Sequence, residues 1–294
     1  MNTAKSICGI ILALTCGLAA TLRAQNIYIV NNGSGTVGEY GLDGSTVNAS
    51  LFTAPNPIGI AISGNDIFVA NWASGTIGEY TTSGATVNAS LIAGVTTPEA
   101  IALSGNNLFV VNGGAAGAGG VSEYTTSGQT VNGHLISGLS GPYAIAISGN
   151  NLFVGNGGTG TVGEYRLDGS TVNASLISGL NAPLGLAISG NDIFIANWNN
   201  GTIGEYTTSG QTINASLITG LNRPFGIAIY GNDLFVANEY GNTVSEYTTS
   251  GAMVNVSLIS GLVNPAGIAI VPEPSADALA GLGVAAFWLW RRRK

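Results

Sequence analysis

Short apolar runs separated by polar turn residues follow one another along most of the chain, in an order that recurs six times. In one copy, a small-sided run at residues 59–62 precedes an aromatic run at 66–71, an alternating run at 76–80 and a more polar run at 86–92. Gly, Ser and Asn residues between these runs are typical of tight turns. Each copy therefore predicts four short antiparallel strands.

The spacing of the copies indicates the fold. The aromatic residue at the centre of each second run recurs at intervals of 40, 41, 44, 41 and 41 residues. Four antiparallel strands in about 40 residues make the unit of a β-propeller blade. A glycine- and alanine-rich expansion at residues 113–120 accounts for the one longer interval and is predicted to be a loop. The six central aromatic residues are Tyr28, Phe68, Phe109, Phe153, Phe194 and Phe235.

The two ends of the repeated region are incomplete copies that complement each other. The region starts with a second strand at residues 26–31 and ends with an unmatched first strand at 267–271. Pairing these two strands would close the ring and leave no open sheet edge between the first and last copies. We therefore predict an all-β, six-bladed β-propeller of four-stranded antiparallel blades, closed by three strands from the N-terminus and one from the C-terminus.

The first 24 residues differ in composition from the repeats. Lys5 precedes an apolar run at residues 7–20, and Ala24 follows a short polar stretch. This order is typical of a secretory signal peptide, and we expect cleavage after Ala24. Both cysteines of the chain, Cys8 and Cys16, would be lost with it. We thus expect a signal peptide at 1–24, a propeller at 25–271 and a separate tail at 272–294.

The charge of the predicted propeller excludes one class of partner. Residues 25–271 contain two basic and thirteen acidic side chains, which gives a net charge of −11. A surface of this sign repels polyanions, so we expect no nucleic-acid binding.

Candidate catalytic groups are few. His134, the only histidine, falls in the Ala-Ser core of the outer-strand pattern Asn-Ala-Ser, so we expect it in water at a blade edge, outside any Ser-His-Asp set or zinc cluster. A glutamate that recurs once in every blade is predicted to be structural, with an acidic metal-binding ring as the alternative. The recurring glutamates are Glu39, Glu79, Glu123, Glu164, Glu205 and Glu246.

One face of the ring is predicted to hold variable side chains. The Asn that closes each second strand is kept in all six copies, whereas the residue after it and the residue after each repeated proline vary. These positions should surround the channel mouth, where aromatic rings beside carboxylates can stack on sugars or hold a peptide. Neutral variation in loops is the alternative. The predicted binding rim consists of Trp72, Glu99, Tyr143, Trp198, Phe225 and Glu239.

The repeats resemble propellers of the NHL and YVTN type. The resemblance rests on the elements Pro-x-Gly-Ile-Ala-Ile and Asp-Ile-Phe-Val-Ala-Asn and covers residues 26–271. It implies the propeller fold, whereas its members serve as binding platforms, lyases and lactonases alike, so it does not decide the activity.

The C-terminal tail resembles a PEP-CTERM sorting signal, in which a Pro-Glu-Pro motif precedes an apolar helix and a basic end. The resemblance implies an exported Gram-negative envelope protein whose tail is recognised and processed by an exosortase-type membrane protease. The apolar stretch at 278–290 is shorter than the roughly 20 residues of a spanning helix, so we expect transient membrane contact, with a permanent anchor as the alternative. The residues that carry this resemblance are Pro272, Glu273, Pro274, Arg291, Arg292 and Arg293.

These observations favour an exported, envelope- or exopolysaccharide-associated monomer that acts as a non-enzymatic binding or matrix protein. We expect no catalytic residue, no metal and no cofactor, and a polysaccharide or another envelope protein as partner. The alternative is a metal-dependent hydrolase or lyase similar to the lactonase and streptogramin-lyase groups, for which Glu99 is the one acid well placed near the axis. A surface protein without a specific ligand is the third possibility.

Overall fold

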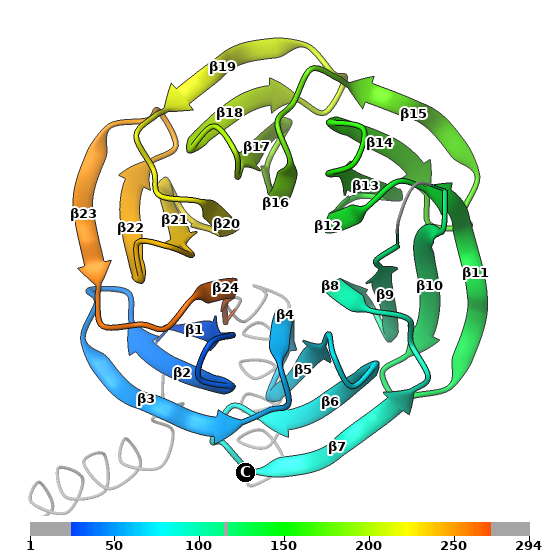
Figure 1. Ribbon diagram of the computed structural model, residues 1–294, viewed down its shortest axis with the longest axis horizontal. Helices are drawn as coiled ribbons and strands as arrows, with labels where there is room; N and C mark the ends of the chain where they lie inside the picture. Colours follow the sequence, from blue (N-terminus) through cyan, green and yellow to red (C-terminus); the bar gives the residue numbers. More distant parts are fainter. Residues whose placement is uncertain (1–24, 115–116, 272–294) are drawn as a thin grey trace, which may run out of the picture.

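The computed structural model describes residues 25–114 and 117–271, and all regular secondary structure in them is β-strand. Twenty-four strands form six four-stranded antiparallel sheets arranged radially around an axis (Figure 1). This confirms the predicted six-bladed propeller. The predicted signal peptide (1–24) and sorting tail (272–294), with its apolar helix, lie outside the described residues. Within the described part of the chain, no helix is long and apolar enough to cross a membrane.

The six blades follow one another along the chain, and each runs from an inner strand at the axis to an outer strand. Blade 1 contains β24 (Pro265–Ile270), β1 (Asn26–Asn31), β2 (Thr36–Gly41) and β3 (Thr46–Thr53). Blade 2 contains β4 (Pro57–Ser63), β5 (Asp66–Asn71), β6 (Thr76–Thr81) and β7 (Thr86–Ala93). Blade 3 contains β8 (Pro98–Ser104), β9 (Asn107–Asn112), β10 (Gly119–Thr125) and β11 (Thr130–Leu139).

The remaining three blades have the same order. Blade 4 contains β12 (Pro142–Ser148), β13 (Asn151–Asn156), β14 (Thr161–Arg166) and β15 (Thr171–Ile177). Blade 5 contains β16 (Pro183–Ser189), β17 (Asp192–Asn197), β18 (Thr202–Thr207) and β19 (Thr212–Ile218). Blade 6 contains β20 (Pro224–Tyr230), β21 (Asp233–Asn238), β22 (Thr243–Thr248) and β23 (Met253–Ile259).

The core lies between neighbouring blades rather than within one sheet. The second strand of each blade is buried on both faces, so its sequence is a continuous apolar run instead of an alternating one. Tyr28 and Val30 of blade 1, for example, pack in one cluster with Ile67 and Val69 of blade 2. The outer strands, by contrast, are largely exposed. Packing between blades therefore holds the ring together, and each blade depends on both neighbours.

Backbones of adjacent inner strands approach closely at the axis. A Cβ atom placed on Gly59 would lie 2.6 Å from the carbonyl oxygen of Glu99 in the next blade. One placed on Gly267 would lie 2.6 Å from the carbonyl oxygen of Ile58. Small residues at the start of each first strand are therefore required by contact between blades.

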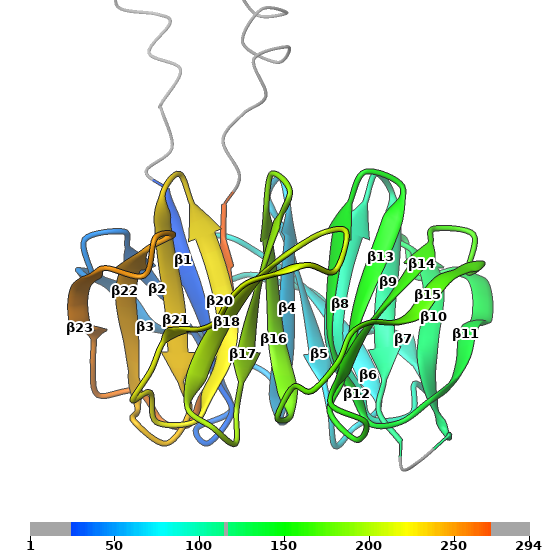
Figure 2. The same cartoon turned by 90° about the horizontal axis from the view of Figure 1, so that it is seen from above.

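Ring closure follows the predicted pairing of the first and last strands. β24 pairs antiparallel with β1 through Ile27 with Ile270, Tyr28 with Ala269 and Ile29 with Ile268. The start of β1 and the end of β24 consequently lie side by side, on the upper face of the ring in Figure 2.

The recurring glutamates accept hydrogen bonds within their own blade. In blade 1, Asn26 Nδ2 donates to Glu39 Oε1 at 2.7 Å, and the Tyr28 hydroxyl donates to the same oxygen at 2.8 Å. Blades 3 and 4 repeat the 2.7 Å bond from Asn107 and Asn151. These hydrogen bonds from side chains of the second strand support the predicted structural role.

Blades 2, 5 and 6 carry Asp where the other three carry this Asn. There the amide donor is missing and two carboxyl groups occupy the same diagonal of the sheet. Burial, followed by repulsion from the neighbouring Asp, raises the pKa of Glu79, Glu205 and Glu246. These three blades therefore place two acidic groups that repel each other where the other blades have an amide-to-carboxylate hydrogen bond.

Removal of β24 should open the ring. A chain that ends before Pro265 leaves β1 unpaired on its inner edge and exposes the contact with blade 6, so we expect aggregation or rapid proteolysis. Limited proteolysis and size-exclusion chromatography would measure this. A chain that ends at Val271 is the matched control and should stay folded. If the shorter chain unfolds at the same temperature as the control, ring closure by β24 does not stabilise the protein.

Replacing the three aspartates with asparagine should stabilise the protein at neutral pH. D66N, D192N and D233N together restore the Asn–Glu hydrogen bond of the other blades, and we expect about 0.5 kcal/mol per site. Because the raised pKa of each glutamate means that repulsion is lost as pH falls, the gain in melting temperature should shrink between pH 7 and pH 4. A triple variant that melts at or below the temperature of the parent at pH 7 would contradict this interpretation.

Candidate functional site

One backbone hydrogen bond, repeated in every blade, builds the face of the ring opposite to the chain ends. The residue after the second strand donates its N–H to the carbonyl oxygen of the residue before the repeated proline, over 2.7–3.2 Å. It thereby places the two series of variable side chains next to each other. The six bonds run from Asn32 to Asn264, Trp72 to Asn56, Gly113 to Thr97, Gly157 to Gly141, Trp198 to Ala182 and Glu239 to Arg223.

The acceptor residues of these bonds have left-handed backbones. A residue before proline is ordinarily extended, yet φ is +40° at Thr97, +54° at Ala182 and +58° at Arg223. Asn and Gly, which tolerate this region, occupy the position in the other three blades. Of the three residues that do not tolerate it well, Thr97 and Ala182 line the cavity described next and Arg223 packs against Trp198 of its wall, so strain of order 1–3 kcal/mol each lies at or beside that cavity.

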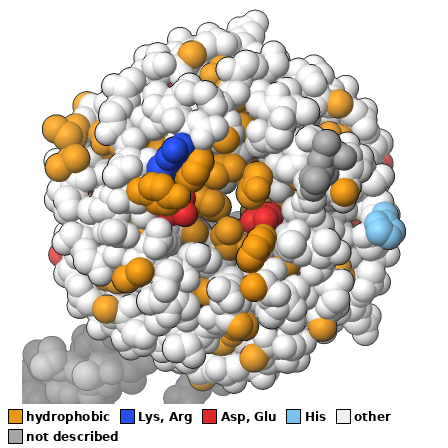
Figure 3. Space-filling view, in the orientation of Figure 1, with side chains coloured by type: hydrophobic (Ala, Val, Ile, Leu, Met, Phe, Trp, Pro, Cys, Tyr) orange, Lys and Arg blue, Asp and Glu red, His pale blue; other side chains and the backbone are white. Residues whose placement is uncertain are grey.

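A cavity of about 660 Å³ opens on this face, at the mouth of the central channel. We call it the mouth cavity. Figure 3 shows hydrophobic side chains gathered around this depression, with acidic side chains at two points of it. Blades 2 to 6 line it, whereas in blade 1 the Asn32 side chain instead donates to the Pro57 carbonyl oxygen at 2.9 Å. A smaller cavity of about 90 Å³ continues below it along the apolar channel.

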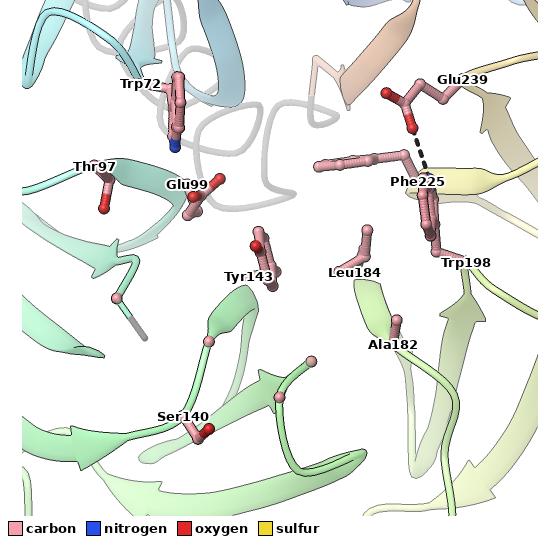
Figure 4. Close-up of a pocket in the computed structure, with 14 residues that line it drawn as sticks. Trp72, Thr97, Glu99, Ser140, Tyr143, Ala182, Leu184, Trp198, Phe225 and Glu239 are labelled. Atoms are coloured by element: carbon pink, nitrogen blue, oxygen red, sulfur yellow. Dashed lines mark hydrogen bonds between the residues drawn. The ribbon is translucent and has the colours of Figure 1, made fainter. Parts of the chain in front are cut away.

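All six residues of the predicted binding rim line the mouth cavity. They come from five of the six blades, and Figure 4 shows their side chains around a common space. Trp72 is 45% exposed, whereas Glu99 is only 5% exposed. Tyr143, Trp198, Phe225 and Glu239 are half-buried. The structure therefore brings the variable positions together, although Glu99 is more deeply placed than a rim residue.

Trp198 is held in place by its neighbours. Its Nε1–H donates to Glu239 Oε2 at 2.6 Å, across the boundary between blades 5 and 6. The Arg223 guanidinium lies 3.9 Å from the centre of the indole ring, and the Tyr240 ring meets the indole edge-on at 5.9 Å. Arg223 also donates to Asn199 Oδ1 at 2.8 Å. Cation–π contact and hydrogen bonding thus fix this aromatic wall before any ligand arrives.

Arg223 and Tyr240 are neighbours of the candidate site that the sequence did not reveal. Arg223 lies two positions before the variable Phe225, and Tyr240 directly follows the variable Glu239. A departure from the repeat at these positions was the available signal, because Arg223 replaces Asn, Thr, Gly or Ala of the other copies.

Glu99 is the most perturbed ionisable group of the cavity. Burial raises the pKa of its carboxyl group to about 7, and the facing Trp72 side chain partly offsets this rise. Its Oε2 atom has no hydrogen-bond partner among the described residues. Burial, together with the charge of Glu99, also raises the pKa of Tyr143, so that phenol stays neutral. The cavity therefore contains a buried carboxyl group that is only partly satisfied.

The other candidate residues, His134 and the recurring glutamates, lie outside the mouth cavity. His134 is exposed on the outer strand β11, away from the mouth cavity. Within residues 25–114 and 117–271, no three His, Cys, Asp or Glu side chains are grouped so that they could hold a metal ion. The recurring glutamates lie on third strands and do not line the channel.

Comparisons with known proteins identify the tail. A model of the PEP-CTERM protein-sorting motif matches residues 271–294. The chain carries this sorting motif at its C-terminus. The motif indicates an exported, envelope-sorted protein and implies recognition by an exosortase. Pro272, Glu273, Pro274 and the basic end lie within the matched segment but outside the described residues.

The likeness to one solved structure supports the fold. One similar structure is titled as a crystal structure of a Nidogen/Laminin complex, with a TM-score of 0.73, 18% identity, and coverage of 85% of this chain and 99% of that chain. Another is a computationally designed protein, Ika8, with a TM-score of 0.49, 18% identity, and coverage of 78% and 70%. At this identity the first likeness concerns the fold alone. A search of curated proteins gave no match.

Replacing Glu99 with Gln should stabilise the protein above pH 7 and flatten its stability profile. Because the folded-state pKa of about 7 lies above the ordinary 4.5, the folded protein keeps a proton that the unfolded chain loses, and stability falls as pH rises through this window. The loss is on the order of 3 kcal/mol, or roughly 5–10 °C in melting temperature. Melting curves of parent and E99Q from pH 4.5 to 8 would test this. Parallel pH profiles would show that Glu99 has an ordinary pKa.

Proposed function

We propose that this protein is an envelope-sorted binding protein that holds a saccharide chain of the cell envelope or exopolysaccharide in the mouth cavity, without catalysis. The proposal rests on the observation that the variable side chains converge on one cavity. Side chains that depart from the repeat, four aromatic and two acidic, line one cavity of about 660 Å³ on an otherwise repetitive protein. A few convergent polar groups in an aromatic cavity are typical of binding sites for small molecules and chain segments.

The chemistry of the lining suits a sugar. Aromatic rings offer flat apolar faces on which the C–H face of a pyranose ring can pack, and carboxylates accept hydrogen bonds from its hydroxyl groups. Trp72 and Trp198 lie in blades 2 and 5, on opposite sides of the mouth, with Tyr143 and Phe225 between them. A chain of sugar units, rather than one isolated unit, fits rings that are spread across the opening.

The sorting motif is compatible with this use of the mouth. β24 ends at Ile270 on the face opposite to the mouth cavity, and the sorting motif begins one residue later. A protein held through its C-terminus would therefore keep the mouth cavity directed away from the point of attachment. Binding can then occur both before and after processing of the tail.

A metal-dependent hydrolase or lyase is the second candidate, and the perturbed carboxyl group of Glu99 is the observation that favours it. Such a mechanism needs several ligands that converge at the axis, and within the described residues Glu99 has no such companions. Stoichiometric calcium or magnesium in the purified protein, measured by elemental analysis, would favour the enzyme over the binding protein.

Trp72 provides the cleanest test of binding. It is 45% exposed, so W72A should remove a stacking surface without lowering the melting temperature. We expect the affinity for the best saccharide on a glycan array to fall about tenfold or more, the equivalent of one lost stacking contact. M253A is the matched control, because Met253 is 66% exposed on the outer strand β23. Equal affinities of parent and W72A for every glycan would remove the mouth cavity as the binding site.

A further inference from the structure

The carboxyl group of Glu99 occupies the point where the mouth cavity meets the channel. It lines both cavities, and Figure 4 shows the carboxyl group directed into the open space between Trp72 and Tyr143. Although the side chain is 95% buried, Oε2 lacks a hydrogen-bond partner within the described residues. An ionised carboxyl group has about four acceptor positions, and leaving them unfilled in a buried site is costly, so the empty site favours the protonated form. The position is therefore suited to a donor that comes from a ligand.

No positive charge among the residues that line the mouth cavity compensates Glu99. The residues that line the mouth cavity include no Lys, Arg or His, and Glu239 adds a second carboxylate on the far side. Arg223, a basic residue on this face, already stacks on the Trp198 ring and donates a hydrogen bond to Asn199. With a net charge of −11 over residues 25–271, the field at the mouth attracts cations.

The aromatic walls add to this preference. Trp72, Tyr143 and Phe225 surround Glu99, and the π face of an aromatic ring attracts ammonium and guanidinium groups. The Trp198 ring already carries the Arg223 guanidinium at 3.9 Å, so one ring of this set is occupied by a cation of the protein itself. The rings near Glu99 have no such partner from the lining residues.

We infer that the saccharide bound in the mouth cavity is an amino sugar, and that its primary ammonium group binds Glu99. This inference rests on the proposed function and names its ligand class. The ammonium group supplies three hydrogen-bond donors and the missing positive charge, while the sugar ring packs on the neighbouring aromatic side chains. A lysine side chain shares the ammonium group but is slender, whereas the cavity of about 660 Å³ is lined by rings from several blades.

The test compares two ligands that differ only at nitrogen. Isothermal titration calorimetry of the exported protein at pH 6 would use the β-1,4-linked glucosamine hexamer and its fully N-acetylated counterpart. We expect the glucosamine hexamer to bind at least about tenfold more tightly, and this preference to disappear in E99Q. Binding to the parent should also release nearly one proton, because Glu99 is largely protonated at this pH before the ammonium group arrives, whereas E99Q should release none.

A matched variant separates the site from general attraction of a polycation. Asp168 lies on an exposed turn, so D168N removes one negative charge outside the mouth cavity and should keep the parent's affinity. An equal loss of affinity for the glucosamine hexamer in D168N and E99Q would overturn the inference. Equal or tighter binding of the N-acetylated hexamer would also overturn it, while leaving the proposed function intact. If neither hexamer nor any other glycan binds, both the amino-sugar inference and the proposed function are wrong. If oligolysine alone binds, the ammonium group belongs to a protein partner, and the amino-sugar inference is wrong.

Discussion

Packing of each blade between two neighbours is the constraint on which the rest of this structure depends. The second strands are buried on both faces by adjacent blades, so none of them is stable at an open end. Pairing of β24 with β1 joins the first and last copies of the repeat, so neither is left with an open sheet edge, and the ring is complete. Close contact of inner strands then fixes their small residues, as at Gly59 and Gly267. A central channel with two distinct faces follows from these contacts.

The proposed function depends on the places where the repeat is broken. The backbone bond between the residue after the second strand and the residue before the proline is the same in all six blades, so it acts as a scaffold for whatever side chains follow it. Gly113 and Gly157 leave space for Glu99 and Tyr143, whereas Trp72 and Trp198 form the walls. An aromatic cavity with a partly satisfied carboxyl group thereby forms on a protein whose repeats otherwise vary little.

The fold could be predicted from the sequence because the repeat of about 40 residues, with four strands in each copy, is typical of propeller blades. Strand order, blade number and closure all follow from copies that can be aligned within the chain, and so does the face on which the variable residues meet. Contacts between side chains of different blades could not be predicted in this way. The bond from Trp198 to Glu239, the stacking of Arg223 and the depth of Glu99 depend on side-chain direction and on the left-handed residue before each proline. Local preference predicts an extended residue there, and the repeated hydrogen bond overrides it.

The central claim is that the departures from the repeat form one binding site at the channel mouth. A crystal structure of the exported protein grown with its best-binding glycan tests this most directly. We expect density for sugar rings in the mouth cavity, with one ring stacked on Trp72 and a polar group of the ligand within hydrogen-bond distance of Glu99. Density on the outer strands or on the face that carries the chain ends, with an empty mouth, would contradict the account.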